Sequence, residues 1–350
     1  MFREPSEQVV PECFVTNEDV AHLAWRRWAA NETRRRAILA YYIVDEWIAS
    51  LTDGLPSVRH VYNPLTLPGN DAVFWASTTT DWQAALRRFP LPSSQMTFTS
   101  LYHSLMAGNL EPAMAASIQG CVLTQEAVME GLSSLAREWQ HAGGGSAFGS
   151  PTPELIGKGL FTFYSSCLQQ MPRDSPTPIR WHLVCATLLQ AVAKYTASDQ
   201  RTDWRNSVPY RRAILHINTV RQMAHDFPIS INSVPQVGLP VTIFQAGMIM
   251  IDHLGHLEKT GSMRFDLEDK IDWLTLGDLG FTTDEGRLRS LSVPAARYVL
   301  NGGVLTVNGY NPGAHHVRPF VDLLSVFGNA WPRCSLMAQE LKTRADLIDR

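Results

Sequence analysis

The residues best suited to chemistry lie between Trp25 and Trp47, in the stretch WRRWAANETRRRAILAYYIVDEW. A run of arginines can bind nucleic-acid phosphates, clamp an acidic ligand, or form the charged side of a packed helix. Glu32 precedes Arg35 and Arg36 by three and four residues, so its carboxylate can pair with either guanidinium on a helix surface. Such pairing neutralises part of the run, which favours a structural role over DNA recognition.

The apolar residues of the same stretch indicate what positions these arginines. Large side chains recur at helical spacing on the other side of the predicted helix, namely Trp25, Trp28, Leu39, Tyr42, Ile43 and Trp47. We therefore predict an amphipathic helix that packs along one side and carries an ion-paired polar side.

Two pairs of histidines are the next candidates. His253 and His256 lie three residues apart beside Asp252, a spacing that can place metal ligands on one helical face. His315 and His316 are adjacent in a glycine-containing loop, without a cysteine or carboxylate close by. Histidines near the C-terminal end of a helix also complement its dipole and find backbone partners, and this structural interpretation is favoured.

Motifs that accompany common catalytic sites are missing from the sequence. It contains no G-x-x-x-x-G-K-[ST] phosphate loop, no G-x-S-x-G nucleophile turn, no H-E-x-x-H zinc motif and no strand-linked G-x-G-x-x-G. The glycines at 143–145 indicate a flexible connector, because no lysine follows them at the spacing of a phosphate loop. We expect a protein that is not an enzyme, without catalytic, cofactor-binding or metal-binding residues in this chain.

Charge and cysteine content narrow the function classes further. The 350 residues carry a formal net charge of −3, which argues against tight general binding to nucleic acid. The five cysteines are too scattered to hold a zinc finger or a binuclear zinc cluster, and we expect them to be reduced thiols. The longest apolar run, 241–251, is about half the length of a bilayer span, which takes on the order of 20 residues. We expect no membrane association and no DNA-binding zinc module in this chain.

Helical periodicity dominates the sequence. Apolar residues recur at intervals of three and four, whereas strict alternation is scarce. This predicts an all-α fold, a large multi-helix domain over residues 1–350 with about ten to twelve helices, no sizeable sheet and a flexible break near 142–152. The glycine-rich segment 298–316 is expected to be a surface loop or a short hairpin. The predicted helices cover 17–51, 80–88, 96–107, 124–141, 153–171, 178–197, 208–226, 240–259, 266–274, 319–328 and 335–348.

A second set of residues follows the arginine helix at fixed distances. The chain continues through VDEWIASLTDGLPSVRHVYNP into LTLPGNDAVFWASTTTDWQAAL. The order is W-x2-W-x3-E-x2-RR, a helix end with Tyr, Asp and Trp, a loop ending in L-P, then D-x3-W-A and a further W. This order closely resembles the fungal-specific transcription factor regulatory domain, or middle homology region, most strongly over residues 20–90. Gly69 departs from the pattern, because many members carry a cysteine after the L-P.

The resemblance implies an all-α domain that regulates transcription of RNA polymerase II genes in a fungal nucleus. In full-length members it lies downstream of a binuclear zinc cluster or of paired two-cysteine, two-histidine fingers. The DNA-binding module, and the zinc with it, would then be missing here or supplied in trans. The implied partners are a homo- or heterodimer partner, the transcription machinery and a possible metabolite effector, with DNA reached only indirectly.

The resemblance also carries over a set of motif residues, to which we assign an architectural role. An arginine is expected to pair with Glu32 or Asp71, and two tryptophans are expected to fill the core beside Trp28. The motif residues are Trp28, Glu32, Arg35, Arg36, Leu67, Pro68, Asp71, Trp75 and Trp82.

An alternative function from another class stays open. The chain could be an all-α small-molecule-binding protein or enzyme with a pocket around the predicted helix at 240–258, lined by Phe244, Met248, Met250 and His253. Methionine and aromatic residues at helical spacing form protein cores more often than ligand sites. The regulatory domain is therefore the leading prediction.

Overall fold

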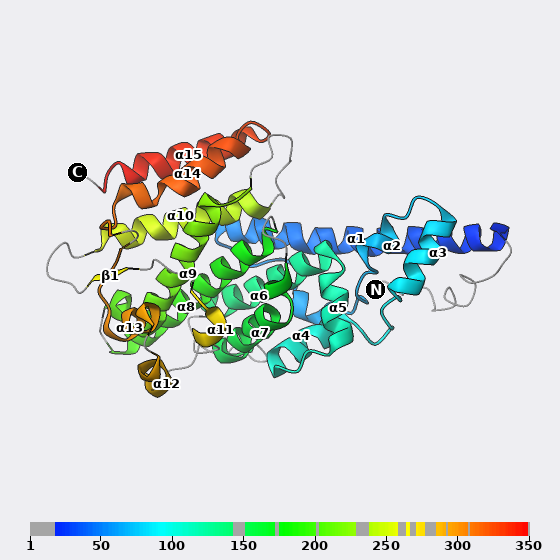
Figure 1. Cartoon of the computed structure of the whole chain (residues 1–350), viewed down its shortest axis with the longest axis horizontal. Coiled ribbons are helices and arrows are strands. Elements are labelled where there is room, and N and C mark those ends of the chain that lie inside the picture. Colours follow the sequence, from blue (N-terminus) through cyan, green and yellow to red (C-terminus); the bar gives the residue numbers. More distant parts are fainter. Residues whose placement is uncertain are drawn as a thin grey trace. The chain divides into compact units, whose positions relative to one another are not determined.

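The computed structural model confirms the all-α prediction (Figure 1). It describes residues 18–142, 151–171, 175–200, 203–228, 238–257, 264–266, 271–276, 285–291, 293–306 and 309–348. The structure is 74% helical, with 12 helices of seven or more residues among those described, which agrees with the ten to twelve expected. The described strands form a single two-stranded sheet. None of the described helices combines the length and the apolar character that a membrane crossing requires.

Contacts divide the chain into two compact units, an N-terminal unit (Met1–Ser134) and a C-terminal unit (Leu135–Arg350). The sequence predicts one domain over the whole length, with a break near 142–152. The division instead falls inside a helix, α6 (Val122–His141). Most of the expected break, residues 143–150, lies outside the described residues.

The N-terminal unit is organised around one long helix. Glu18 and Asp19 provide negative charge in the first turn of this helix, α1, where it stabilises the helix dipole. The buried stripe of α1 carries Glu32 and Arg36 among its apolar residues, so this helix brings charges into the interior. The described helices of the unit are α1 (Glu18–Thr52), η2 (His60–Tyr62), α2 (Asp71–Phe74), α3 (Thr79–Arg88), α4 (Phe98–Ala107), α5 (Pro112–Gln119) and the first part of α6.

Local capping explains where the shorter helices begin. The side chains of Thr78 and Thr97 accept hydrogen bonds from backbone N–H groups in the first turns of α3 and α4. Ser100 completes a reciprocal capping box with Thr97, and Gly108 ends α4 in the left-handed conformation. An isolated antiparallel bridge between Thr66 and Thr97 fixes the loop before α2 against the start of α4. The start of α4 is therefore fixed by its capping box and by the bridge, and its end is set by Gly108.

A glycine allows a close approach of side chain to backbone in this unit. The fully buried Tyr102 of α4 donates a 2.9 Å hydrogen bond from its hydroxyl to the carbonyl oxygen of Ala127 in α6. A Cβ atom on Gly131 would lie 1.8 Å from that hydroxyl oxygen, far inside van der Waals contact. Position 131 therefore accepts no side chain unless the tyrosine moves.

The substitution Gly131→Ala is expected to destabilise the N-terminal unit by about 1–3 kcal/mol, because overpacking forces a buried ring out of its rotamer. Chemical denaturation of the full chain measures the change. Gly255→Ala is the control, since a Cβ there meets no atom within 4 Å. Equal stability of the two variants would contradict the packing described.

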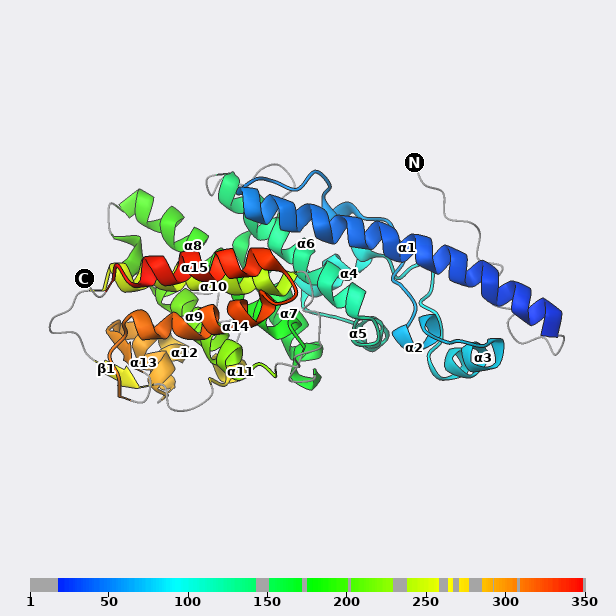
Figure 2. The ribbon, with the colours of Figure 1, turned by 90° about the horizontal axis from the view of Figure 1, so that it is seen from above.

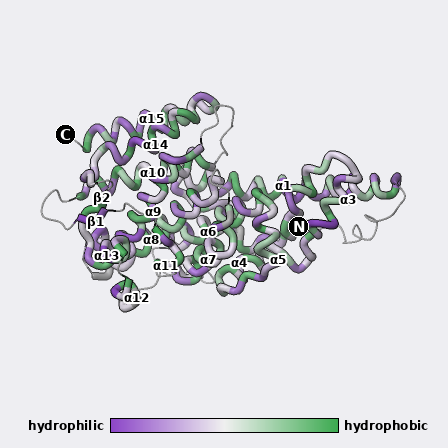
Figure 3. The backbone as a smooth tube through the Cα atoms, viewed as in Figure 1, coloured by the Kyte–Doolittle hydropathy of each residue, from purple (hydrophilic) through white to green (hydrophobic). Residues whose placement is uncertain are grey.

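The C-terminal unit is a packed set of helices. Helices α10, α14 and α15 run side by side in both ribbon views (Figures 1 and 2). Green and purple bands alternate along α14 and α15 (Figure 3), the pattern of helices that bury one face. The described elements are α7 (Pro153–Ser166), η3 (Leu168–Gln170), α8 (Thr177–Gln200), η4 (Trp204–Asn206), α9 (Val208–His225), α10 (Gly238–Gly255), β1 (Arg264–Asp266), α11 (Trp273–Leu276), α12 (Glu285–Ser290), α13 (Pro294–Asn301), β2 (Val304–Thr306), η6 (Ala314–His316), α14 (Arg318–Phe327) and α15 (Pro332–Ala345).

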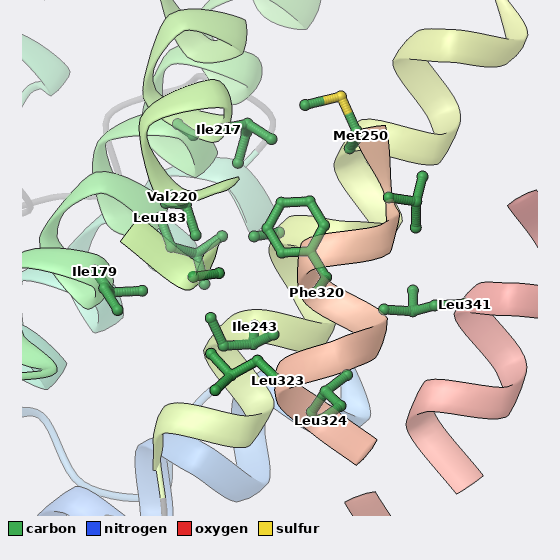
Figure 4. Close-up of a cluster of buried hydrophobic side chains, with 14 of the residues drawn as sticks. Ile179, Leu183, Ile217, Val220, Ile243, Met250, Phe320, Leu323, Leu324 and Leu341 are labelled. Atoms are coloured by element: carbon green, nitrogen blue, oxygen red, sulfur yellow. The ribbon is translucent and has the colours of Figure 1, made fainter. Parts of the chain in front are cut away.

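Five helices build the core of this unit. Side chains from α8, α9, α10, α14 and α15 form one apolar cluster, in which Phe320 points among aliphatic residues of the neighbouring helices (Figure 4). Phe320, Ile243 and Leu341 are fully buried. Burial of this apolar surface is the main force that holds the five helices together.

Two local predictions are wrong in this unit. The predicted helix over 266–274 is not formed by its described residues, because Asp266 ends a strand, 271–272 are not helical and α11 begins only at Trp273. Residues 267–270 lie outside the described part of the chain. The segment 298–316 is neither a loop throughout nor a hairpin. Helix α13 ends within it, and β2 pairs in parallel with β1, Phe265 opposite Leu305. Parallel pairing joins residues far apart in sequence, which local periodicity does not report.

Candidate functional site

Arg36 is the centre of the predicted motif site. Its Nε donates to Glu32 Oε1 at 2.9 Å, and its Nη1 donates to Asp71 Oδ1 at 2.7 Å. Its Nη2 donates to the carbonyl oxygen of Gly69 at 2.8 Å. The guanidinium is buried, and its donors bind Glu32 on the same helix, Asp71 at the start of α2 and the Gly69 carbonyl in the loop before α2. It therefore joins α1 to α2 and to the preceding loop.

Glu32 is the anionic partner at the base of the site. Its side chain is fully buried and accepts from Arg35 Nη1 at 2.7 Å as well as from Arg36. The backbone N–H of Gly69 donates to Glu32 Oε1 at 3.0 Å. A buried carboxylate is stable only when its oxygens are satisfied in this way. The carboxylate of Glu32 therefore depends on both arginines and on the loop.

Asp71 extends the network to two more helices. Its Oδ2 accepts from the backbone N–H of Val122 at 2.9 Å, the first residue of α6. Its own N–H donates to the carbonyl oxygen of Gly120, just after α5. A carboxylate at a helix N-terminus is favoured by the unpaired N–H groups and the dipole there. Arg36 and Asp71 together connect α1, α2 and the junction between α5 and α6.

Gly69, where the sequence departs from the pattern that it resembles, lies against this network. A Cβ atom at this position would meet side-chain atoms of Leu91 at 3.3 Å and Trp28 at 3.4 Å. The distance to Leu91 is slightly tighter than ordinary packing and the distance to Trp28 is at its limit, so a side chain at this position would require Leu91 to shift by a few tenths of an ångström. The backbone of the loop, rather than the side chain at position 69, makes the contacts.

The charges of the site are set by burial and pairing. Burial alone would lower the pKa of Arg36, but nearby Cys121 and the hydrogen bonds to Asp71 and Glu32 raise it overall. Burial raises the pKa of the Cys121 thiol to about 11, and Asp71 adds to the rise. The thiol is therefore protonated near neutral pH and is a poor nucleophile.

Aromatic residues cover the network on its apolar side. The rings of Trp28 and Trp82 lie 5.7 Å apart, and both side chains are buried. The Phe74 ring covers the Arg36 guanidinium at 4.0 Å from the ring centre. Together with Val73 these residues form the core between α1, α2 and α3. Every donor and acceptor described above is directed at another part of the same unit, as expected for a structural site.

Six of the nine motif residues lie in the network or in the aromatic core beside it, namely Trp28, Glu32, Arg35, Arg36, Asp71 and Trp82. Leu67 and Pro68 are buried in the loop before α2. Trp75 does not fill the core, because its side chain is 74% exposed and touches the edge of Phe74. Helix α2 ends after a single turn at Phe74, and Val73 and Phe74 take the inward positions. The prediction that Trp75 fills the core beside Trp28 is therefore wrong.

The exposure of Trp75 leads to a direct test. Trp75→Ala is expected to change the free energy of unfolding by less than about 0.5 kcal/mol, because the ring already lies in solvent. Urea denaturation of the full chain measures it. A loss above about 1 kcal/mol in the free energy of unfolding would show that the Trp75 ring is packed in the core.

Sequence patterns missed a buried pair of histidines in the C-terminal unit. His182 on α8 and His216 on α9 face each other with their Nδ1 atoms 2.9 Å apart, a hydrogen bond that requires one Nδ1–H donor. The ring of His216 stacks on Trp273 at 4.0 Å, and Trp181 lies edge-on to both histidines. The only signal in the sequence is a histidine among apolar neighbours on each of two predicted helices.

Burial keeps this pair neutral. It lowers the pKa of His182 to about 3. It also lowers the pKa of His216 well below its usual value, and His182 and Arg212 add to this. Both imidazoles are therefore uncharged near neutral pH, and the pair forms a polar contact between two core helices.

Three of the four histidines singled out in the sequence make hydrogen bonds within the chain. His253 Nδ1 lies 3.3 Å from the hydroxyl of Tyr210, and His256 Nδ1 donates to the carbonyl oxygen of Asp252 at 2.7 Å. His316 Nδ1 accepts from the N–H of Gly313, which leaves the hydrogen on Nε2, away from metal-ligand chemistry. Within the described residues, no group of three His, Cys, Asp or Glu side chains could hold a metal ion.

The predicted pocket helix, α10, places most of its candidate ligand residues in the core. Met250 is buried in the apolar cluster, and Phe244 and Met248 pack against that cluster. His253 contacts Tyr210 of α9. These four residues serve packing between helices in the C-terminal unit.

Comparison with known proteins gives no relative from which to transfer a function. No protein-family model, curated protein or solved structure matches the chain. The resemblance over residues 20–90 therefore stays a prediction, and the function has to be argued from the residues themselves.

Proposed function

We propose that the chain is the regulatory or effector domain of a fungal transcription factor, acting on RNA polymerase II genes in the nucleus. One observation carries the proposal: residues of the spaced motif, separated by up to 35 positions, converge on Arg36. The spacing of the motif is explained if its residues are selected to meet in one hydrogen-bonded network that stabilises the N-terminal unit. The role we assign to the chain is not enzymatic.

The geometry of the arginine run supports an indirect relation to DNA. Arg35 and Arg36 are paired with Glu32 and Asp71, so their charges are compensated within the unit. Phosphate binding draws its affinity from arginines and lysines that are free to neutralise phosphates. We propose that DNA contact, with any zinc it needs, comes from a module outside this chain or from a partner. Dimerisation and contact with the transcription machinery are then the activities to test.

A tethering experiment tests this function. The full chain is fused to an unrelated sequence-specific DNA-binding module and expressed in yeast with a reporter that carries the matching site. We expect reporter output to differ from that of the module alone, in either direction. Arg34→Ala, at an exposed position of α1, is the matched control and should keep the effect. Output equal to the module alone, at equal protein abundance, would contradict the proposal.

The alternative function is binding of a small molecule by a pocket around α10. It has less support, because Met250 of α10 is buried in the apolar cluster and Phe244 and Met248 pack against that cluster.

A further inference from the structure

The solvent side of α1 changes its character halfway along the helix. In the first half, the exposed positions include charged residues such as Glu18, Arg26 and Arg34. From Ala37 to Thr52, a range that the structure describes in full, no exposed position carries a charge. A helix at the surface of a globular protein normally turns charged or polar residues towards water. The second half of α1 is therefore shaped for contact with something other than water.

Four large apolar side chains form a stripe on this half of the helix, which we call the α1 stripe. Their side chains are between 43% and 59% exposed, and they are Tyr41, Val44, Ile48 and Leu51. They follow one another at intervals of three, four and three residues, which is the spacing of the a and d positions in paired helices. Their exposed area is on the order of 400 Å², the size at which an apolar patch marks an interaction site.

The chemistry of the α1 stripe favours a protein helix over a lipid surface as its partner. Helices that lie in a membrane interface carry lysine and arginine beside their apolar face. The exposed positions described between Ala37 and Thr52 contain neither residue. Intervals of three and four residues instead allow each side chain to fit between the side chains of a facing helix.

The spacing of the α1 stripe is also symmetric, so that it fits a second copy of itself. The intervals are three, four and three in either direction along the helix. A two-fold axis between Val44 and Ile48 would place Tyr41 opposite Leu51 of the second copy. Val44 would then face Ile48 of the second copy across the axis. Such a contact uses the same surface on both chains, and its closed symmetry gives a dimer instead of a filament.

Charge selects the antiparallel orientation of the two helices. A parallel pair would bring the first halves of both α1 helices together, with Arg26 and Arg34 next to their own copies. Like charges at such short distances repel. An antiparallel pair directs the two first halves away from each other, while all four positions of the α1 stripe remain in contact.

We infer that the α1 stripe is the contact surface of a homodimer, in which the stripes of two copies of this chain pack antiparallel. The four positions of both copies bring together on the order of 800 Å² of apolar surface, close to the roughly 1,000 Å² of a specific interface. An interface of this size gives a reversible dimer. The inference rests on the proposed function for its role in the cell, where it identifies the dimer partner as a second copy.

Sedimentation equilibrium of the full chain, at about 1–100 µM, tests the inference. We expect the mass to rise with concentration from that of one chain towards that of two. Val44→Glu and Ile48→Glu are each expected to weaken the association at least about tenfold, because each buries a carboxylate against an apolar side chain. Leu23→Glu is the matched control, since it changes an exposed leucine in the first half of α1 and should leave the association unchanged.

A double variant tests the orientation. In Val44→Glu with Ile48→Lys, each glutamate of an antiparallel dimer faces a lysine of the second copy, whereas a parallel dimer would bring like charges together. We expect this variant to associate at least about tenfold more tightly than either single glutamate variant. Circular dichroism of each variant, all at exposed positions, confirms that the chain is folded.

The inference is overturned if the chain is a monomer throughout this concentration range, if both single glutamate variants associate like the original chain, or if the double variant does not recover. A monomer that binds phosphatidylcholine vesicles would assign the α1 stripe to a membrane and would overturn it as well. A monomeric chain that still changes reporter output would overturn this inference alone. A dimeric chain without any effect on the reporter would overturn the proposed function alone.

Discussion

Arg36→Ala is expected to destabilise the N-terminal unit by about 3–5 kcal/mol, the cost of leaving a buried ion without its partner. The substitution removes the hydrogen bonds to Asp71 and Gly69 and one of those to Glu32, whose carboxylate remains fully buried. It also frees the Phe74 ring from its contact with the guanidinium. This loss is a large share of the stability of a typical domain.

The measurement has to report on one unit, because two units can unfold separately. Hydrogen–deuterium exchange of peptides from α1 and from residues 67–74, analysed by mass spectrometry, gives that local stability. Arg34→Ala changes an exposed arginine of the same helix and should leave exchange almost unchanged, as expected for a solvated surface residue. A loss below about 1 kcal/mol for Arg36→Ala would mean that the pair behaves like an exposed ion pair.

Acidification is expected to destabilise the C-terminal unit through the pair His182 and His216. Burial lowers the pKa of His182 to about 3, and that of His216 lies well below its usual value. Histidine in the unfolded chain has a pKa of about 6.5, so below this pH the unfolded state gains protons that the folded state does not. The free energy of unfolding therefore falls as the pH drops from 6.5 towards 3. Between pH 7.5 and pH 5 the expected loss is about 2 kcal/mol for each histidine, or about 4 kcal/mol for the pair.

Other titratable residues also change the free energy of unfolding with pH, so the measurement has to separate them from the histidine pair. Burial lowers the pKa of both His253 and His316 to about 4, which adds to the loss in the same unit. Burial raises the pKa of Glu126 to about 7, with Glu130 adding to the rise, so acidification stabilises the N-terminal unit at this residue. The pH dependence must therefore be followed by hydrogen exchange in peptides of α8 and α9.

A double variant isolates the histidine pair. In His182→Asn with His216→Asn, an amide takes the place of each Nδ1 atom without titrating between pH 5 and pH 7.5. We expect this variant to lose about 4 kcal/mol less between these pH values than the original chain, whatever its stability at pH 7.5. An unchanged pH slope would show that the pair is not the neutral buried contact described.

The parts of this structure that local spacing determines could be predicted from the sequence. The pairing of Glu32 with Arg35 and Arg36 follows from their separation by three and four residues on a helix. The long amphipathic helices follow from periodicity in the same way. Asp71 as a second partner of Arg36 could be expected only from the family resemblance, because the two residues are 35 positions apart.

The features that depend on tertiary contacts could not be predicted. Trp75 fits the spacing of the motif, but α2 stops one residue before it, and the ring remains in solvent. His182 and His216 pair across 34 residues, and nothing in either local sequence points to the other. The parallel strands β1 and β2 are too short and too far apart for alternation to reveal them. Short helices such as α5 and α12 give too few turns for a periodic signal.

The central claim has two parts. Arg35 and Arg36 of α1 form ion pairs that stabilise the N-terminal unit, and the chain reaches promoters through another module. Its most direct test is the affinity of the full chain for promoter DNA, measured by fluorescence anisotropy at about 50 mM and about 200 mM salt. We predict no sub-micromolar binding at either salt concentration, and no difference between the original chain and Arg34→Ala. Sub-micromolar affinity that falls steeply with salt and is weakened by Arg34→Ala would contradict the claim that another module contacts DNA, because it would place the exposed arginine side of α1 on DNA phosphates.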